Sequence, residues 1–450
     1  MAVALVALVG CGTRLPSGSF AAGDSTLGTA ATSPTGTPPT SQGQTQPASD
    51  VGITSNEIRV GLIVSQTSPL GSETFSPPMY GALAYFQALN ARGGIHGRMV
   101  RVITCDDGST GTGNLQCAHK LVDVDKVFAF AGNSIFNYQA AAFVSAHDVP
   151  DVGGQPIDNA YDQYPHLYSI YGSDSPRDGR TVGFDGKLYG GTEVYRYFKE
   201  ALGARTAGVV YYNQSDSQRF GDLTVAGLQV EGYQIVREQV DFAVPNFDAA
   251  AIDMRAHHVD VVFDALDSNG NVNLCKSMDA AHLTVKAKAT TVQSWDDTAR
   301  TQYAGSPVCR NSLYATGTDR NYEDTQFAAV AQFRSDIHTA FPERDNRVSA
   351  WELEGWASAQ WLTDALTSCG AAPTRACIES YLETVRNYDG HGVFTGRDFQ
   401  VNTHPGGQTH NCLTVAQWQD SAQAGRGGWV TRSPGKNYVC FDVPSIPYTP

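Results

Sequence analysis

Several residues of this chain could do acid–base or metal chemistry, but their spacing does not favour it. Asp106 and Asp107 form an acidic pair, and two carboxylates can act as general acid and general base. Adjacent strand residues point to opposite faces, however, so the pair could not share one site. His257 and His258 are also adjacent, and on a helix they diverge too far to bind one metal ion.

A third group, His404, His410 and Cys412, carries zinc-ligand types. These residues fall in an irregular stretch, where we expect Cys412 to be in a disulfide instead. The chain has no GxSxG, no GxxxxGK[ST], no HExxH and no GxGxxG after a strand. We therefore expect no catalytic residues, no metal and no cofactor, and predict that the protein is not an enzyme.

The cysteines indicate an oxidising compartment. Of the nine cysteines, one lies near the start of the chain and eight remain for disulfides. Sequence does not fix their pairing; sequential pairing would give four local bridges. A zinc site is the alternative, but the CxxC half-site is missing. The eight are Cys105, Cys117, Cys275, Cys309, Cys369, Cys377, Cys412 and Cys440.

The N-terminus resembles a lipoprotein signal. The apolar run Ala2–Val9 suits the core of a signal peptide, and Leu8-Val9-Gly10-Cys11 resembles a bacterial lipobox with Cys11 as the lipidated residue. The first cation is Arg14, so we expect the start of the chain to be truncated or misassigned. Residues 12–50 are rich in Gly, Ser, Thr and Pro and predict a disordered tether.

Composition excludes other classes of protein. The 450 residues carry a formal net charge of -14, which disfavours nucleic acid as a partner. No window of about 20 apolar residues follows the N-terminus, so contact with the membrane is expected through the lipid anchor alone.

Apolar periodicity from residue 51 onward alternates between strand and helix. Strands are expected at 58–64, 100–104, 127–131 and 149–153, and the pattern restarts after a long helix at 181–202. Such alternation specifies parallel sheets covered by helices. We predict an α/β protein with two doubly wound parallel-sheet lobes joined by hinge strands, with a β-rich annex near the C-terminus. The expected divisions are a signal peptide at 1–11, a first lobe of 51–176 with 318–390, and a second lobe of 177–317 with 391–450.

One stretch is specific enough to suggest a family. The segment Asn90–Arg98 reads Asn-Ala-Arg-Gly-Gly-Ile-His-Gly-Arg and is followed by a strand and by Asp106-Asp107. It resembles the signature of type 1 periplasmic binding proteins, in the branch that includes leucine/isoleucine/valine-binding proteins. The resemblance covers roughly 51–365 and implies a two-lobed fold that binds a small molecule in the cleft.

A two-lobed α/β protein binds at the carboxyl ends of its strands. The expected cleft loops are 66–71, 132–137, 153–156, 213–220, 266–269 and 293–297. The resemblance implies that Ser134 binds a carboxylate, that Phe220 replaces a tyrosine, and that Asp296 binds an ammonium. Trp295 could stack on the ligand. The full set of candidate ligand-binding residues is Ser68, Asn133, Ser134, Asn137, Gln155, Phe220, Asp267, Trp295 and Asp296.

We therefore predict an extracytoplasmic, lipid-anchored, monomeric solute-binding protein. It would close on an amino acid, amide or related carboxylate and deliver it to the permease subunits of an ABC importer. Two alternatives stay open: a sensing or surface lipoprotein without a transport role, and an extracellular hydrolase on the same scaffold.

Overall fold

The computed structural model describes residues 47–155, 157–290, 292–401 and 405–449. The expected signal peptide, Cys11 and most of the expected tether lie outside these residues. Residues 47–50, which we had assigned to the tether, contact the folded body: Ser49 donates to the carbonyl of Pro373 at 2.7 Å, and Asp50 accepts from the backbone N–H of Arg375 at 2.8 Å.

The first sheet is parallel, in the order β2-β1-β3-β4-β5. Its strands are β1 (Glu57–Val64), β2 (Met99–Asp106), β3 (Ala129–Ala131), β4 (Asp151–Gly154) and β5 (Leu167–Ser169). Alternate residues of a strand face opposite sides. Val60 and Leu62 accordingly pack in one apolar cluster with α1 (Pro77–Ala91) and α12 (Ala350–Ser368), whereas Ile63 packs with α2 (Gly111–His119) and α3 (Ala141–Ala146). Both faces of this sheet are thus covered, as a doubly wound sheet requires.

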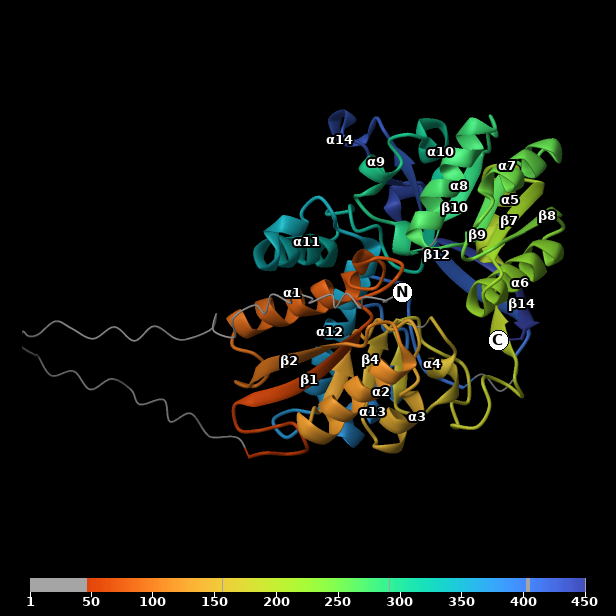
Figure 1. Cartoon of the computed structure of the whole chain (residues 1–450). Helices are drawn as coiled ribbons and strands as arrows, with labels where there is room; N and C mark the ends of the chain where they lie inside the picture. Colours follow the sequence, from red (N-terminus) through yellow and green to blue (C-terminus); the bar gives the residue numbers. More distant parts are fainter. Residues whose placement is uncertain (1–46, 156, 291, 402–404, 450) are drawn as a thin grey trace, which may run out of the picture. The chain divides into compact units, whose positions relative to one another are not determined.

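The helices α1 and α12 lie side by side, with their backbones in close approach (Figure 1). A Cβ atom added at Gly81 would lie 1.9 Å from the carbonyl oxygen of Glu352, and one at Gly355 would lie 2.0 Å from that of Pro78. The helix α12 begins with a capping box between Ser349 and Glu352. Its packing against α1, α11 (Ala328–Ala340) and α13 (Arg375–Thr384) places residues 328–384 beside the first sheet.

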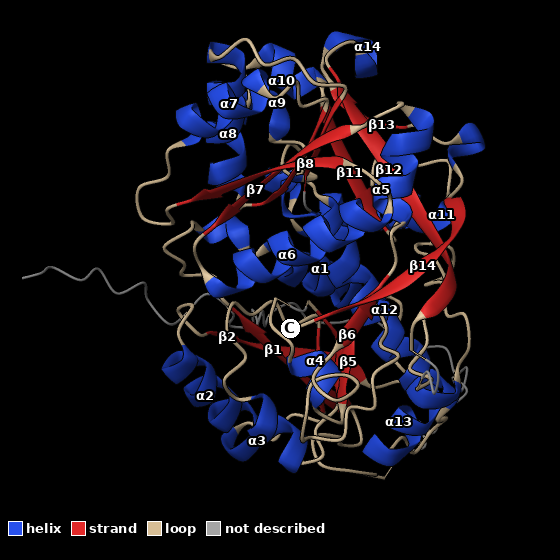
Figure 2. Cartoon of the chain, turned by 90° about the vertical axis from the view of Figure 1, so that its right-hand side faces the viewer, coloured by secondary structure: helices blue, strands red, loops and turns tan. Residues whose placement is uncertain are grey.

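The second sheet has nine strands and mixed direction. Its parallel part comprises β7 (Thr206–Tyr212), β8 (Gln234–Val240), β9 (Val261–Ala265), β10 (Ala287–Thr290) and β11 (Leu313–Gly317). The remaining strands are antiparallel: β12 (Gly407–Gln419), β13 (Gly428–Thr431), β14 (Val439–Tyr448) and β6 (Leu188–Gly190). The long strands β12 and β14 run beside each other (Figure 2). The predicted two-sheet α/β fold is confirmed, with the C-terminal annex extending the second sheet.

Five helices that follow β7 in the chain lie beside the second sheet: α6 (Ser215–Val230), α7 (Phe247–Ala256), α8 (Ser268–Ala280), α9 (Ala299–Gln302) and α10 (Pro307–Asn311). The predicted long helix at 181–202 is wrong: α5 spans Glu193–Ala201, and the segment before it holds turns and β6. Gly183 and Gly186 have φ angles of 60° and 79°, which end any helix there. The short helix α4 (Ala160–Gln163) lies between β4 and β5, and α14 (Ala422–Gly425) lies between β12 and β13.

Three crossings, which are segments of the chain that run from one sheet to the other, connect the two sheets. One buried guanidinium forms hydrogen bonds with residues of these crossings. Arg397, in the crossing between α13 and β12, donates from Nε to the carbonyl of Ile170 at 2.9 Å. Its Nη2 donates to Thr318 Oγ1 at 2.5 Å and to Asp319 Oδ1 at 3.2 Å. These partners lie in the other two crossings, so the expected hinge is held by a polar cluster and not by apolar packing alone.

The eight cysteines form four disulfides in sequential order. The pairs are Cys105–Cys117, Cys275–Cys309, Cys369–Cys377 and Cys412–Cys440. Of the helices that the structure describes, none combines the length and apolar character needed to cross a membrane.

Candidate functional site

A cavity of about 480 Å³ lies at the carboxyl ends of the parallel strands. Each of the six expected cleft loops contributes to its lining. The contributions are Leu70, Phe136, Gln155, Phe220, Asp267 and Gln293. Helix α12, the crossing after β5 and the end of β14 add Trp351, Tyr171 and Tyr448. The lining therefore comes from both sheets.

Aromatic rings dominate the wall of this cavity. On the side of the first sheet, the Phe75 ring centroid lies 5.6 Å from that of Phe136 and 6.0 Å from that of Trp351. On the side of the second sheet, the ring of Tyr212 meets that of Phe242 edge-on at 5.2 Å. Such a wall suits a ligand with an apolar body.

Gln155 is held in one orientation by a tryptophan. Trp351 donates from Nε1 to Gln155 Oε1 at 2.7 Å. An indole N–H is a donor only, which assigns the amide oxygen to that side. The amide nitrogen of Gln155 is buried and has no hydrogen-bond partner among the described residues, so it is free to donate to a ligand or a water molecule.

Asp267 lies where β9 leads into α8. Its carboxylate caps α8 by accepting from the backbone N–H groups of Asn269 and Gly270, and it accepts from Tyr212 Oη at 2.7 Å. Burial, followed by the nearby charge of Asp267, raises the pKa of Tyr212 above its usual value. The phenol thus stays protonated and holds the carboxylate in place.

Arg219 bridges the two sides of the cavity. It comes from α6, and its guanidinium donates to Asn159 Oδ1 and to the carbonyl of Ile157, both at 2.7 Å. A second bridge runs from Asn269 Nδ2 to the carbonyl of Leu70 at 3.4 Å. These contacts hold loops of the two sheets together over the cavity.

The structure brings three of the nine candidate residues to the cavity wall: Gln155, Phe220 and Asp267. Of the other six, Asn133, Ser134 and Trp295 are buried away from it and Asp296 is half-buried. Asn133 accepts from the backbone N–H of Ile63 and donates to Asp151, and Ser134 pairs through its backbone with neighbouring strands. Trp295 packs on Trp429, and Asp296 accepts from Thr298.

The last two candidates, Ser68 and Asn137, lie outside the lining as well. Ser68 Oγ accepts from the backbone N–H of Leu70, as in a turn, and the side chain of Asn137 is exposed. Conversely, sequence reasoning missed Trp351, Tyr171 and Arg219. The cleft loops were expected where strands end, and neither Trp351 nor Tyr171 follows such an end: Trp351 lies at the start of a helix and Tyr171 lies in a crossing. Arg219 does fall inside an expected cleft loop.

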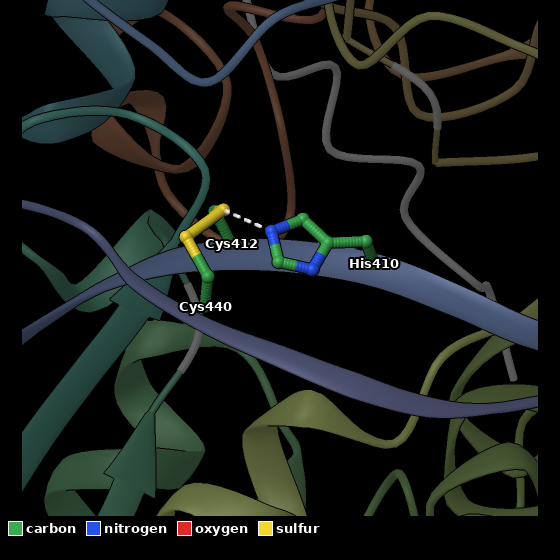
Figure 3. Close-up of side chains that lie close together, drawn as sticks. All are labelled: His410, Cys412 and Cys440. Atoms are coloured by element: carbon green, nitrogen blue, oxygen red, sulfur yellow. Dashed lines mark hydrogen bonds between the residues drawn. A yellow bond between two sulfur atoms is a disulfide. The ribbon is translucent and has the colours of Figure 1, made fainter.

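The possible metal group near the C-terminus is a disulfide beside a histidine (Figure 3). Cys412 and Cys440 are bonded to each other, and His410 Nε2 lies 3.9 Å from Cys412 Sγ. Bonded sulfurs are not thiolates and do not bind zinc as such. The other ring nitrogen of His410 lies 2.8 Å from Asp442. His404 lies outside the described residues.

The fold has the features of a two-lobed binding protein: two sheets covered by helices, three crossings between them, and a shared cavity at the strand ends. A family model described as "Periplasmic binding protein" matches residues 57–425. The chain therefore belongs to the periplasmic binding protein family, and the type 1 resemblance seen in its sequence is confirmed.

Similar proteins include both curated and solved examples. An amino acid binding protein of Pseudomonas aeruginosa is 26% identical over 302 residues, which are 65% of this chain and 73% of that protein. A leucine-binding protein of Thermotoga maritima has a TM-score of 0.64 at 14% identity and covers 84% of this chain and 100% of its own. A fatty acid transporter substrate-binding protein of Thermomonospora curvata has a TM-score of 0.64 at 12% identity and covers 85% of this chain and 93% of its own. At these identities the two structures show the fold.

Proposed function

We propose that this protein is an extracytoplasmic solute-binding lipoprotein, which captures a small organic molecule by closure of its two lobes and delivers it to an ABC importer. The observation that carries the proposal is the cavity of about 480 Å³ with walls from both sheets. A site made from two lobes is completed when they approach, and this is how hinge closure couples binding to a change of shape.

The names of the relatives support the transport role. They describe an amino acid binding protein, a leucine-binding protein and a fatty acid transporter substrate-binding protein. Because these ligands differ in charge and shape, they do not by themselves identify the ligand of this chain. The ligand class must be inferred from the residues that line the cavity of this chain.

Uptake in the native cell tests the transport role. Protein purified without dialysis would be denatured, and its released small molecules would be identified by mass spectrometry. Deletion of the gene should then lower uptake of the released compound, and the wild-type gene should restore it. Unchanged uptake, together with binding of the same compound by the purified protein, would favour a sensing or surface role instead.

The lipid anchor is proposed on the sequence around Cys11, and the four disulfides agree with an extracytoplasmic location. Expression of a Cys11→Ser variant in the native cell should release the protein from the membrane fraction. Membrane retention of this variant equal to that of the wild type would contradict the anchor.

A further inference from the structure

The lining of the cavity holds more negative than positive side chains. Among the described lining residues, five are aspartates and Arg219 is the only cation. Lys288 balances the negative charge of one of these aspartates, since its Nζ lies 2.7 Å from Asp264 Oδ2. Two nitrogens of the Arg219 guanidinium donate to Asn159 and Ile157, whereas its Nε is buried without a partner among the described residues. The described lining therefore sets one partly engaged cation against five aspartates, which disfavours an anionic ligand.

Two backbone donors at the first-lobe loop are occupied as well. The N–H of Phe136 donates to Ser65 Oγ at 2.9 Å, and that of Tyr138 donates to Asp158 at 2.7 Å. Ser134, in the same loop, is fully buried and lies outside the lining. A carboxylate needs charge-assisted hydrogen bonds to replace its water shell, and neither these two N–H groups nor Ser134 supplies them.

Three aromatic rings of the lining are open to solvent. Tyr171, Phe220 and Phe242 are 41%, 40% and 43% exposed. Exposed apolar surface gathered around a cavity marks a place for a ligand. The faces of aromatic rings attract cations, and the guanidinium carbon of Arg219 already lies 4.5 Å from the centroid of Phe220.

Two polar groups of the lining retain capacity for a ligand. Asp267 Oδ1 accepts from Tyr212 and Gly270, whereas Oδ2 accepts one long bond of 3.3 Å from Asn269. A carboxylate oxygen can accept more than one donor, so Oδ2 can receive an ammonium group. Gln155 is 3% exposed, and its amide nitrogen has no partner among the described residues.

We propose that the cavity selects organic ammonium cations with an aromatic or branched apolar body and no carboxylate. This inference rests on the proposed solute-binding function and narrows its ligand class. Asp267 supplies the counter-charge, the exposed rings of Tyr171, Phe220 and Phe242 cover the apolar body, and the amide of Gln155 donates to an oxygen of the ligand or to a bound water molecule.

Calorimetric titration of the full chain with compounds matched in shape tests the charge preference. Phenethylamine, phenylalanine and 3-phenylpropanoate share a ring and differ in charge; isopentylamine, leucine and 4-methylpentanoate do the same with a branched body. We expect each amine to bind at least about tenfold more tightly than its carboxylate-bearing partners. The amino acids must bury a carboxylate that has no charged partner, and the two carboxylates also lack the ammonium that pairs with Asp267.

Equal or tighter binding of either carboxylate-bearing class would overturn the cation proposal and leave the solute-binding function standing. Absence of binding by all six compounds would also overturn it. The solute-binding function would then be decided separately, by the co-purified compound and the uptake assay.

Substitution of Asp267 tests its assignment. Asparagine is also a good N-cap and can accept from Tyr212, so Asp267→Asn should fold. We expect it to weaken phenethylamine binding about 10- to 100-fold while leaving the neutral analogue phenethyl alcohol unaffected. Asp279→Asn is the matched control, because Asp279 also accepts backbone N–H groups, from Val308 and Cys309, but lies outside the lining.

Equal losses for the amine and the alcohol, or no loss for the amine, would contradict the role of Asp267. If Asp267→Asn does not fold, Phe220→Leu at an exposed position provides the second test. It should weaken phenethylamine and phenethyl alcohol alike, because both carry the apolar body that the ring covers, and unchanged affinity for both would contradict the role of Phe220.

Discussion

At the scale of single residues, the hydrogen bond from Trp351 to Gln155 has a measurable energetic consequence. Trp351→Phe would leave the buried Gln155 Oε1 without its donor. The matched control is Trp361→Phe, since Trp361 is also fully buried but its Nε1 has no partner among the described residues. We expect Trp351→Phe to lower the free energy of unfolding by about 1–3 kcal/mol more than Trp361→Phe does. Equal losses in chemical denaturation would show that the hydrogen bond contributes nothing.

Asp151 gives a pH-dependent prediction. Its Oδ2 accepts from Asn133, Tyr138 and Tyr161, while its Oδ1 has no partner among the described residues. Burial raises the pKa of this carboxyl from 3.8 to about 6, against the lowering effect of its donors. The folded state therefore holds a proton that the unfolded chain releases near pH 4, and this contribution to stability is lost as the pH rises through about 6.

Asp151→Asn should remove that contribution, because the amide oxygen can keep the three donors and the amide carries no charge. Relative to the variant, the wild type should lose about 1–3 kcal/mol of unfolding free energy between pH 4 and pH 7. Denaturation curves at several pH values measure the difference. A constant difference across this range would refute the raised pKa.

Some site residues were predictable from sequence and others were not. The strand ends fix which loops face the cleft, and Gln155, Phe220 and Asp267 lie in such loops. Sequence does not fix which way a side chain points, so Ser134 and Trp295 were expected at the cleft although they lie in the interior. Trp351 reaches the cavity from a helix nearly 200 positions after Gln155, a proximity that only the tertiary fold creates.

At the scale of elements, the contact between α1 and α12 depends on glycine. Gly81→Ala would place a methyl carbon 1.9 Å from a backbone carbonyl oxygen of α12, and neither helix can move without disturbing the core. We expect a loss of about 3 kcal/mol or more in unfolding free energy. Gly305→Ala is the control, since a Cβ there would meet nothing within 4 Å and should change stability by less than about 1 kcal/mol. Similar effects of the two changes would contradict the close approach.

The periodicity of apolar residues predicted several parallel strands correctly. It failed where glycines interrupt a helix and where strands pair in antiparallel fashion. Runs such as Ile58–Val64 and Val127–Ala131 correspond to strands because both faces are buried. The segment at 181–202 carries helical apolar spacing in its second half only, and Gly183 and Gly186 keep the first half from being helical. The register of β12 with β14 is set across the sheet, so local sequence could indicate β structure there but not its place in the second sheet.

At the scale of the whole molecule, Arg397 connects the three crossings. Arg397→Lys keeps the positive charge but cannot reach the carbonyl of Ile170, Thr318 and Asp319 together. Because these groups are buried, we expect a loss of about 2–4 kcal/mol in unfolding free energy. Arg101→Lys, at a side chain that is 61% exposed, should change stability by less than about 0.5 kcal/mol. Equal effects would mean that the guanidinium does not hold the crossings.

Capture by this protein requires closure of the two lobes around a ligand. Small-angle X-ray scattering would compare the full chain stripped of ligand with the same chain saturated by the tightest-binding compound of the titration series. We predict a smaller radius of gyration and a shorter maximum dimension in the bound state. Identical scattering curves at proven saturation would contradict closure, and with it the proposed mechanism of capture.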